Sequence, residues 1–466
     1  MRCSRCQLDN LGRVKFCGEG AAPLTADCPT CGAANPPRNR ACGHSSVADS
    51  SSSWRQVRSW GMWTRPTAEF VLLLVVAALS GSCTTVKTIE ENAERVVSGQ
   101  PVDTEGVKRA VAADTRDLEA HLQQLRRKFE EALAKLTADV QQRWGQKETK
   151  VATRTVYVKY TQHYTSRVVT DFDHGLLTVE TLDDKDPQGS LKAAIVAALL
   201  TSNDPASVDL FSDKDVTLDA NRTPYLYGLV LDNHGKPIRT RVQAEQFARF
   251  LVPQKVQTRA VQSDQGGKAA RFVKLTMVKN FEAKGAERYR ASVAKYSAEY
   301  QVSPSLVLAI MRTESNFNPF AVSGAPAYGL MQLVPTSGGR AAYRRVKGLD
   351  QTPTPEYLFD PEHNIELGAA YLSVLGHNEF HTVSSQNSRE YCVIAAYNTG
   401  PSNVTRTFAK DKKEALKVIN GLEPSALYER LRTSLPHEET RQYVVKVTGY
   451  RKQFVDTAAG PPGAVP

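Results

Sequence analysis

The sequence predicts an α+β protein, in which a small α+β amino-terminal domain is followed by a mainly α-helical domain. From Thr153 onwards, apolar and polar residues alternate as they do in β-strands, and two triplets, Asp173-His174-Gly175 and Asn233-His234-Gly235, are typical of hairpin turns. From about Gly285, apolar residues recur at helical intervals instead. These two periodicities, one after the other along the chain, predict the order of the two domains.

Residues 1–61 contain a cysteine pattern that occurs twice. Cys3, Cys6 and Cys17 are followed at the same spacing by Cys28, Cys31 and Cys42. The spacing resembles paired zinc ribbons, where two Cys-x2-Cys pairs supply four thiolates to one ion. The fourth ligand is absent from both sets, although His44 could complete the second. We interpret the segment as a degenerate zinc-ribbon-like extension with Cys28, Cys31, Cys42 and His44 as its zinc candidates, and expect no other cofactor.

Residues 62–83 have the pattern of a lipoprotein signal peptide. A cationic start at Arg65 leads through about ten apolar residues to small residues and Cys83. That apolar run is too short to span a bilayer, which takes about 20 residues. We expect acylation of Cys83 and a lipid anchor in the membrane; Thr84, by analogy, favours the outer membrane. The alternative to a signal peptide is a buried helix that ends at an ordinary cysteine. Met62 is the expected true start of the protein.

A polar tether, residues 84–104, is expected before the accessory domain, residues 105–280. An amphipathic helix is predicted from about 105 to 144, with apolar residues at steps of three or four: Leu118, Leu122, Leu125, Phe129, Leu133, Leu136 and Val140. An apolar helix at Leu191–Leu200 and a strand at Arg271–Val278 complete the domain. Its histidines are scattered in turns, so we assign it no reaction.

The helical domain, residues 285–455 before a flexible tail at 456–466, contains a carboxylate in an unusual place. Ser303 and Pro304 begin a helix as N-cap and first residue. Glu314 lies seven residues after Val307, on the stripe that is otherwise apolar. Burial raises the pKa of a carboxyl group and keeps a general acid protonated. The alternative is a helix-end glutamate whose carboxylate reaches water.

Three further blocks follow Glu314-Ser315. They are Ser323-Gly324-Ala325-Pro326-Ala327-Tyr328-Gly329-Leu330-Met331-Gln332, Pro361-Glu362-His363-Asn364-Ile365-Glu366-Leu367-Gly368-Ala369-Ala370-Tyr371-Leu372, and Ala395-Ala396-Tyr397-Asn398-Thr399-Gly400-Pro401. In this order the blocks resemble the motifs of the lytic transglycosylase catalytic domain, a lysozyme-like helical fold that cleaves peptidoglycan. The segments Tyr157-Val158-Lys159-Tyr160-Thr161 and Tyr225-Leu226-Tyr227-Gly228 are similar to the amino-terminal domain of a membrane-bound branch of that family.

The resemblance implies a reaction that needs one acid. Glycosidases that use two carboxylates add a second Asp or Glu to the proton donor, and no partner for Glu314 stands out in the motifs. In the family, the C6 hydroxyl of N-acetylmuramic acid attacks its own C1, so the product is a 1,6-anhydromuramyl sugar and no water is consumed. Glu314 would protonate the leaving oxygen and then accept the C6 hydroxyl proton.

The resemblance also assigns roles to the other motif residues. The hydroxyl of Tyr397 is expected near the scissile bond or Glu314. Met331, Gln332, Asn398, Tyr371 and Ser323 are the expected substrate-binding residues, with Ser323 placing an N-acetyl group. Core packing of Met331 and Tyr397, and a turn-capping role for Asn398, are the structural alternatives. Pro326 stands where the family usually has glycine, so the loop that follows Ser323 is expected to differ in shape.

The formal charge of +10 favours an anionic partner. Peptidoglycan glycan strands, with their peptide carboxylates, fit this charge. We expect no nucleic acid, because basic and aromatic residues form no common stripe. The predicted enzyme is therefore a lipid-anchored peptidoglycan lytic transglycosylase on the periplasmic face of the outer membrane. Two alternatives are a wall-binding lipoprotein without turnover and a muramidase that hydrolyses the same bond.

Overall fold

The computed structural model describes residues 88, 95, 104–216, 218–263, 266–324 and 327–458. The zinc candidates, the signal peptide with Cys83, almost all of the tether, and Pro326 lie outside these residues. The chain divides into two units, Met1–Asp114 and Thr115–Pro466. Helix α3 (Thr104–Trp144) crosses that boundary, and all contacts described below belong to the second unit.

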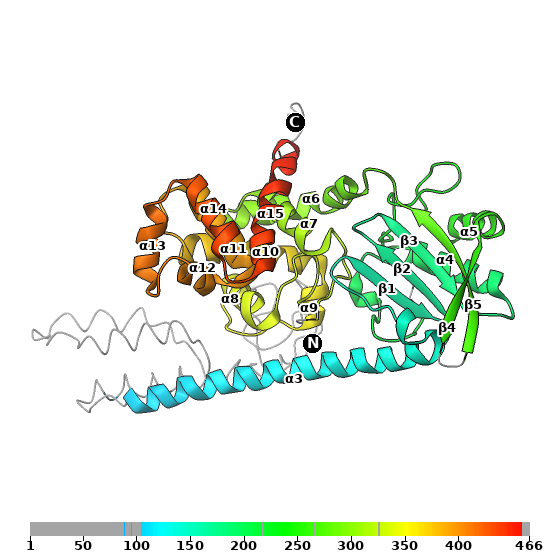
Figure 1. Cartoon of the computed structure of the whole chain (residues 1–466), viewed down its shortest axis with the longest axis horizontal. Coiled ribbons are helices and arrows are strands. Elements are labelled where there is room, and N and C mark those ends of the chain that lie inside the picture. Colours follow the sequence, from blue (N-terminus) through cyan, green and yellow to red (C-terminus); the bar gives the residue numbers. More distant parts are fainter. Residues whose placement is uncertain are drawn as a thin grey trace, which may run out of the picture. The chain divides into compact units, whose positions relative to one another are not determined.

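The accessory domain is built on a five-stranded antiparallel sheet with strand order β1-β2-β3-β5-β4 (Figure 1). Its elements are β1 (Val156–Thr161), β2 (Ser166–Asp171), β3 (Leu176–Thr181), α4 (Pro187–Leu200), α5 (Arg241–Lys255), β4 (Gln257–Ser263) and β5 (Gly266–Thr276). Short 3-10 turns lie at Gln146–Glu148 and Pro205–Ser207. Asp186 caps α4, and a capping box of Thr240 with Gln243 begins α5.

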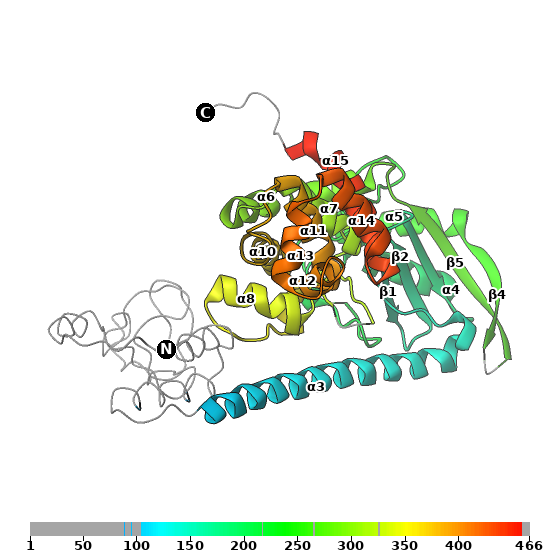
Figure 2. The same cartoon turned by 60° about the vertical axis from the view of Figure 1, so that its left-hand side comes forward.

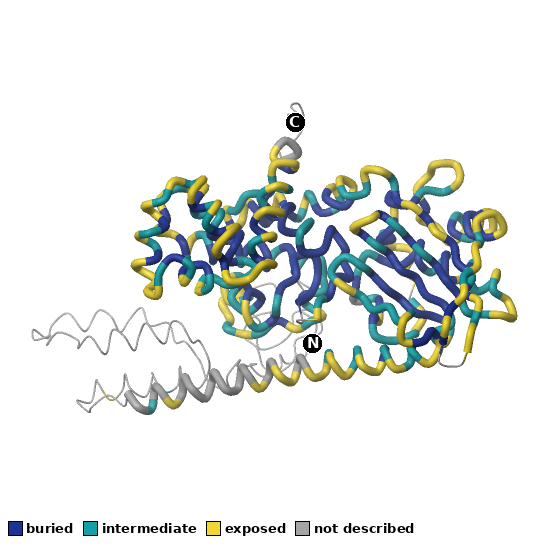
Figure 3. The backbone as a smooth tube through the Cα atoms, viewed as in Figure 1, coloured by how far each residue is buried: buried dark blue, intermediate teal, exposed yellow. Residues whose placement is uncertain are grey.

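Each face of this sheet has its own apolar core. One core, which includes Leu177 and Val179 of β3, is shared with α4 and α5. On the other, Val158 and Tyr160 of β1 contact the last turns of α3, which end at Trp144. Because side chains alternate along a strand, neighbouring residues of β1 serve opposite cores. Figure 3 shows the central strands as buried.

The second domain is mainly helical, and no sheet strand lies in its described residues (Figure 2). Its helices are α6 (Phe281–Tyr300), α7 (Pro304–Ser315), α8 (Arg340–Lys347), α9 (Pro355–Phe359), α10 (Pro361–Val374), α11 (Gln386–Thr399), α12 (Pro401–Arg406), α13 (Lys412–Asn420), α14 (Pro424–Ser434) and α15 (Glu438–Ala458). Single π-helical turns lie at Pro335–Gly339 and Leu375–Glu379. Helix α7 is buried between α6 and α15 and carries the motif glutamate.

The predicted α+β class is confirmed, with some differences in detail. The first triplet turns between β2 and β3 as expected. The second, at Asn233-His234-Gly235, forms a turn beside an isolated bridge between Leu231 and Pro237 and does not join two sheet strands. Helix α15 continues to Ala458, three residues into the expected tail. Strand β4 and helix α5 were not predicted from the sequence.

Candidate active site

Glu314 lies in the last turn of α7, where the sequence predicted it. Val307, Ile310 and Met311 on the same stripe are fully buried, and Glu314 itself is only 6% exposed. Pro304 is the first residue of the helix, and Ser303 occupies the N-cap position. The Ser303 hydroxyl contacts that of Ser305, however, and makes no cap hydrogen bond. Because Glu314 is buried, the alternative of a helix-end glutamate whose carboxylate reaches water is wrong in this structure.

Two side chains from other elements reach the Glu314 carboxyl group. The Tyr443 hydroxyl, from α15, donates a hydrogen bond of 2.7 Å to Oε1. The guanidinium Nη1 of Arg154, from the loop before β1, lies 3.7 Å from Oε2. Burial raises the pKa of Glu314 to about 7, against the lowering effects of Tyr443 and Arg154. At neutral pH this carboxyl group therefore exists in both protonation states.

Tyr443 and Arg154 were not among the predicted site residues. Tyr443 lies 129 positions after Glu314, and only the packing of α15 along α7 brings it there. The segment Arg441-Gln442-Tyr443 resembles the carboxy-terminal part of the lytic transglycosylase family. This resemblance is the one sequence signal that could have indicated Tyr443. Arg154 belongs to the other domain, and no local pattern marks it.

The Gly-Leu-Met-Gln block forms a tight loop held by side chains of α7 and α10. Asn364 of α10, fully buried, accepts a hydrogen bond from the Met331 amide at 2.7 Å and donates to the carbonyls of Tyr328 and Leu358. Ser315 of α7 donates to the Leu330 carbonyl at 2.8 Å. These bonds join the residue next to Glu314 directly to the loop.

Met331 is placed in the core by this loop. Its side chain is fully buried, and a Cβ added at Gly368 of α10 would lie 2.1 Å from its sulfur, so only glycine fits at that point. The side chain thus packs in the core, as in the structural alternative for Met331, and its predicted role toward a substrate stays a prediction. Gln332 has a left-handed backbone with φ of 46°, and its amide group donates to the Gly329 carbonyl.

Tyr397 and Tyr371 lie together beside this loop. The Tyr397 hydroxyl donates to the Met331 carbonyl at 2.8 Å and not to Glu314, and its ring centroid lies 5.4 Å from that of Tyr371. Burial raises the pKa of Tyr397 well above its usual value, and the nearby Glu314 raises it further. The hydroxyl hydrogen bond of Tyr397 therefore orders the loop, and its predicted role near the scissile bond stays a prediction.

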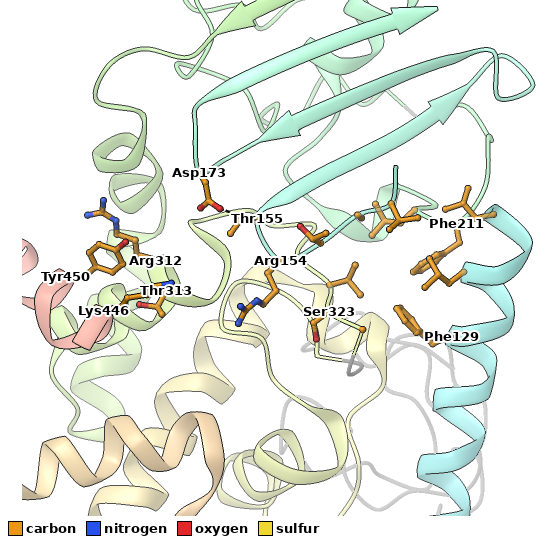
Figure 4. Close-up of a pocket in the computed structure, with 18 residues that line it drawn as sticks. Phe129, Arg154, Thr155, Asp173, Phe211, Arg312, Thr313, Ser323, Lys446 and Tyr450 are labelled. Carbon is orange, nitrogen blue, oxygen red and sulfur yellow. Dashed lines mark hydrogen bonds between the residues drawn. The ribbon is translucent and has the colours of Figure 1, made fainter. Parts of the chain in front are cut away.

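Asn398 and Ser323 occupy different surroundings. The Asn398 side-chain oxygen accepts a hydrogen bond of 2.6 Å from the Thr440 hydroxyl, so it caps no turn at Gly400. Ser323 lines a cleft with a volume of about 540 Å3. Figure 4 shows Arg154 and Ser323 in its middle, with Arg312, Lys446 and Tyr450 at one end and Phe129 and Phe211 at the other. The substrate-binding roles of Asn398 and Ser323 stay predictions.

Comparison with known proteins shows the family of the chain. Residues 120–288 match the model of the membrane-bound lytic murein transglycosylase C N-terminal domain, and residues 291–420 match the transglycosylase SLT domain. A membrane-bound lytic murein transglycosylase C from Serratia proteamaculans is 38% identical over 83% of this chain and 99% of its own length. The chain belongs to this family. Another transglycosylase C, from Sodalis glossinidius, is 40% identical over 70% of this chain and 90% of its own.

One solved structure that matches covers a smaller part of this chain. The 70 kDa soluble lytic transglycosylase from Escherichia coli is 27% identical over 37% of this chain and 24% of its own, with a TM-score of 0.29. The two family models and the two relatives confirm, at the level of the family, the resemblance to lytic transglycosylases drawn from the four motif blocks. The boundary between the two matched models falls inside α6.

Proposed function

We propose that the chain is a peptidoglycan lytic transglycosylase in which Glu314 is the single acid and base. Glu314 in its protonated form gives its proton to the oxygen that links N-acetylmuramic acid to N-acetylglucosamine, and the C1–O bond breaks. The C6 hydroxyl of the same muramic acid then forms a bond to C1, and its proton passes to the Glu314 carboxylate. The products are a 1,6-anhydromuramyl end and a free N-acetylglucosamine hydroxyl, without consumption of water.

The observation that carries this proposal is the environment of the Glu314 carboxyl group. Burial raises its pKa to about 7, so a large fraction is protonated at neutral pH and can act as an acid. The 2.7 Å hydrogen bond from Tyr443 fixes one carboxyl oxygen and stabilises the carboxylate that proton transfer leaves behind. A single group with both forms accessible fits a reaction that needs an acid first and a base afterwards.

The test is mass spectrometry of the muropeptides that the full chain, solubilised in detergent, releases from purified sacculi. We expect anhydro products, one water lighter than hydrolytic ones, and none from Glu314→Gln. The control is Glu429→Gln, which changes an exposed glutamate of α14 and should release the same products as the unchanged chain. Reducing ends would mean a muramidase, and wall binding without release would mean a non-catalytic lipoprotein. Either result contradicts the proposal.

We also propose that the protein works in the cell envelope, anchored through a lipid on Cys83 at the periplasmic face of the outer membrane. The names of the relatives, which call them membrane-bound, support an envelope location. The run from Arg65 to Cys83 supports a lipid anchor. Within the described residues, no helix is both long and apolar enough to cross a membrane.

Intact mass of the exported protein tests the anchor. We expect a chain that begins at Cys83 and carries acyl groups, in the outer-membrane fraction, and a Cys83→Ala variant without them. A retained residue 1–61 segment with bound zinc would contradict both the anchor and the start at Met62. Cys392→Ala is the matched control, since that thiol is buried in α11 and should not affect the mass beyond the substitution.

A further inference from the structure

Arg154 is the one cation that an ion pair brings to Glu314 within the described part of the chain, and it comes from the accessory domain. Its position is fixed from the catalytic side. The buried Asn318, four residues after Glu314, donates to the Arg154 carbonyl at 3.1 Å. The Val322 amide contacts the Thr153 carbonyl at 3.5 Å. The loop that bears Arg154 is therefore held against the segment that follows Glu314.

The Arg154 guanidinium is shared between two carboxylates. Its Nη1 lies 3.7 Å from Glu314 Oε2 and 3.4 Å from Oε1 of Glu439, at the start of α15. Glu314 is buried, whereas the Glu439 side chain is 67% exposed. The buried carboxylate gains most from a nearby cation, because water screens the exposed one. The exposed Glu439 carboxylate nevertheless also pairs with the Arg154 guanidinium, so two carboxylates share its positive charge.

We propose that Arg154 is a positioning residue through which the accessory domain stabilises the carboxylate form of Glu314, and that Glu439 limits this effect by sharing the guanidinium. This rests on the proposed function, in which Glu314 is a carboxylate between its two proton transfers. If Arg154 were bound to Glu314 alone, the Glu314 carboxyl group would ionise too readily to serve as an acid. Without Arg154, the buried carboxylate would be held by Tyr443 only.

The other charged and titratable groups around α7 are consistent with opposite effects of Arg154 and Glu439 on Glu314. Tyr443 and Glu439 face Glu314 from α15, and Tyr397 faces it from α11. From α6 the charged neighbour of α7 is Glu282, which pairs with Arg312 at 2.5 Å. Arg154 lowers the pKa of Glu314 and Glu439 raises it, after the larger effects of burial and of Tyr443.

The test is the pH profile of kcat/KM for soluble glycan strands, measured on the full chain in detergent. Because the reaction needs protonated Glu314, activity falls as pH rises through its pKa. Arg154→Gln should move this alkaline limb upward by roughly 0.5 pH unit or more, and Glu439→Gln should move it downward. The double variant should return it toward the unchanged protein. Arg222→Gln, an exposed accessory-domain arginine paired with Asp204, should leave it in place.

Opposite shifts from the two variants would support the inference, since a purely structural role gives no opposite signs. Unchanged limbs with a raised KM for Arg154→Gln would overturn it and make Arg154 a substrate contact. Shifts of the same sign would also overturn it. Full activity of Glu314→Gln would instead contradict the proposed function, so the two failures are distinguishable.

Discussion

At the residue scale, the catalytic candidate depends on where its carboxyl group is buried. Glu314 shares a stripe with fully buried apolar residues, which destabilises its ionised form. Tyr443 and Arg154 partly offset that effect. The balance leaves a pKa of about 7, where one side chain can both give and accept a proton.

The burial of Glu314 should make stability depend on pH. Its pKa is about 7 in the folded protein, against an ordinary value of 4.5 for a glutamate side chain, so the folded state holds the proton to higher pH. The associated stability is present below pH 4.5 and is lost as pH rises through 7, by roughly 3 kcal/mol in full. Glu314→Gln should therefore gain stability relative to the unchanged protein between pH 5 and pH 8.5, as measured by urea unfolding. A constant difference across that range would contradict this.

Removal of the Tyr443 hydroxyl should affect catalysis more than folding. Tyr443→Phe keeps the ring but deletes the donor to Glu314, so the carboxylate formed during the reaction is less stable. We expect kcat to fall by roughly 10- to 100-fold, from the 1.5–3 kcal/mol typical of a hydrogen bond to a charged group. The alkaline limb should also rise in pH. Tyr428→Phe in α14 is the control; equal losses from both variants would sink the prediction.

At the element scale, the loop at residues 328–332 is ordered by hydrogen bonds to its backbone. Asn364 accepts from the Met331 amide and Tyr397 donates to the Met331 carbonyl, so both backbone polar groups of this residue are bound by side chains. Ser315 connects the preceding carbonyl to α7. The motif blocks therefore meet at the main chain of this loop more than at a substrate surface.

Asn364→Leu should disrupt that loop. The variant leaves the Met331 amide and the Leu358 carbonyl without the Asn364 partner, each at about 1–3 kcal/mol, and removes one of two hydrogen bonds to the Tyr328 carbonyl. We expect the free energy of unfolding to fall by roughly 3 kcal/mol or more, with activity lost in proportion to the disordered loop. Denaturant unfolding and the release of muropeptides measure the two effects. Asn403→Ala, which removes bonds to Thr399 within one helical turn, should change both much less.

Sequence reasoning recovered the elements whose signals are local. The stripe of α7, the proline that begins it, and the hairpin between β2 and β3 each depend on residues a few positions apart. The partners of Glu314 could not be predicted in this way. Tyr443 and Arg154 arrive through the packing of α15 and of another domain, and Met331 is buried because of Gly368, 37 positions later.

At the scale of the whole molecule, the two domains share an aromatic contact. Phe320 comes six residues after Glu314 in sequence, yet it is fully buried in the core of the accessory domain. Its ring stacks on Tyr157 at 4.3 Å and meets Tyr225 edge-on at 5.2 Å. Asn316 adds a hydrogen bond of 2.7 Å to the Phe172 carbonyl. The segment after Glu314 thus belongs to both domains.

Phe320→Ala should therefore weaken both domains together. Deletion of a buried phenylalanine side chain typically removes about 3–5 kcal/mol of stability. We expect one thermal transition, at a lower temperature, when sheet and helix signals are followed separately by circular dichroism. Phe250→Ala, at a position 40% exposed on α5, should shift it little. Two separate transitions in the Phe320 variant would show that the domains do not depend on each other.

Phe320 also imposes an order on biosynthesis. The last strand of the sheet ends at Thr276, but the residue that completes the accessory core comes 44 positions later, beyond α6 and α7. As the chain leaves the ribosome or the export channel from its amino terminus, the sheet can form while a place in its core is still vacant. The accessory domain becomes complete only when α7 and the residues that follow it have emerged. A truncated chain that ends before Phe320 is therefore an incomplete domain, exposed to proteolysis.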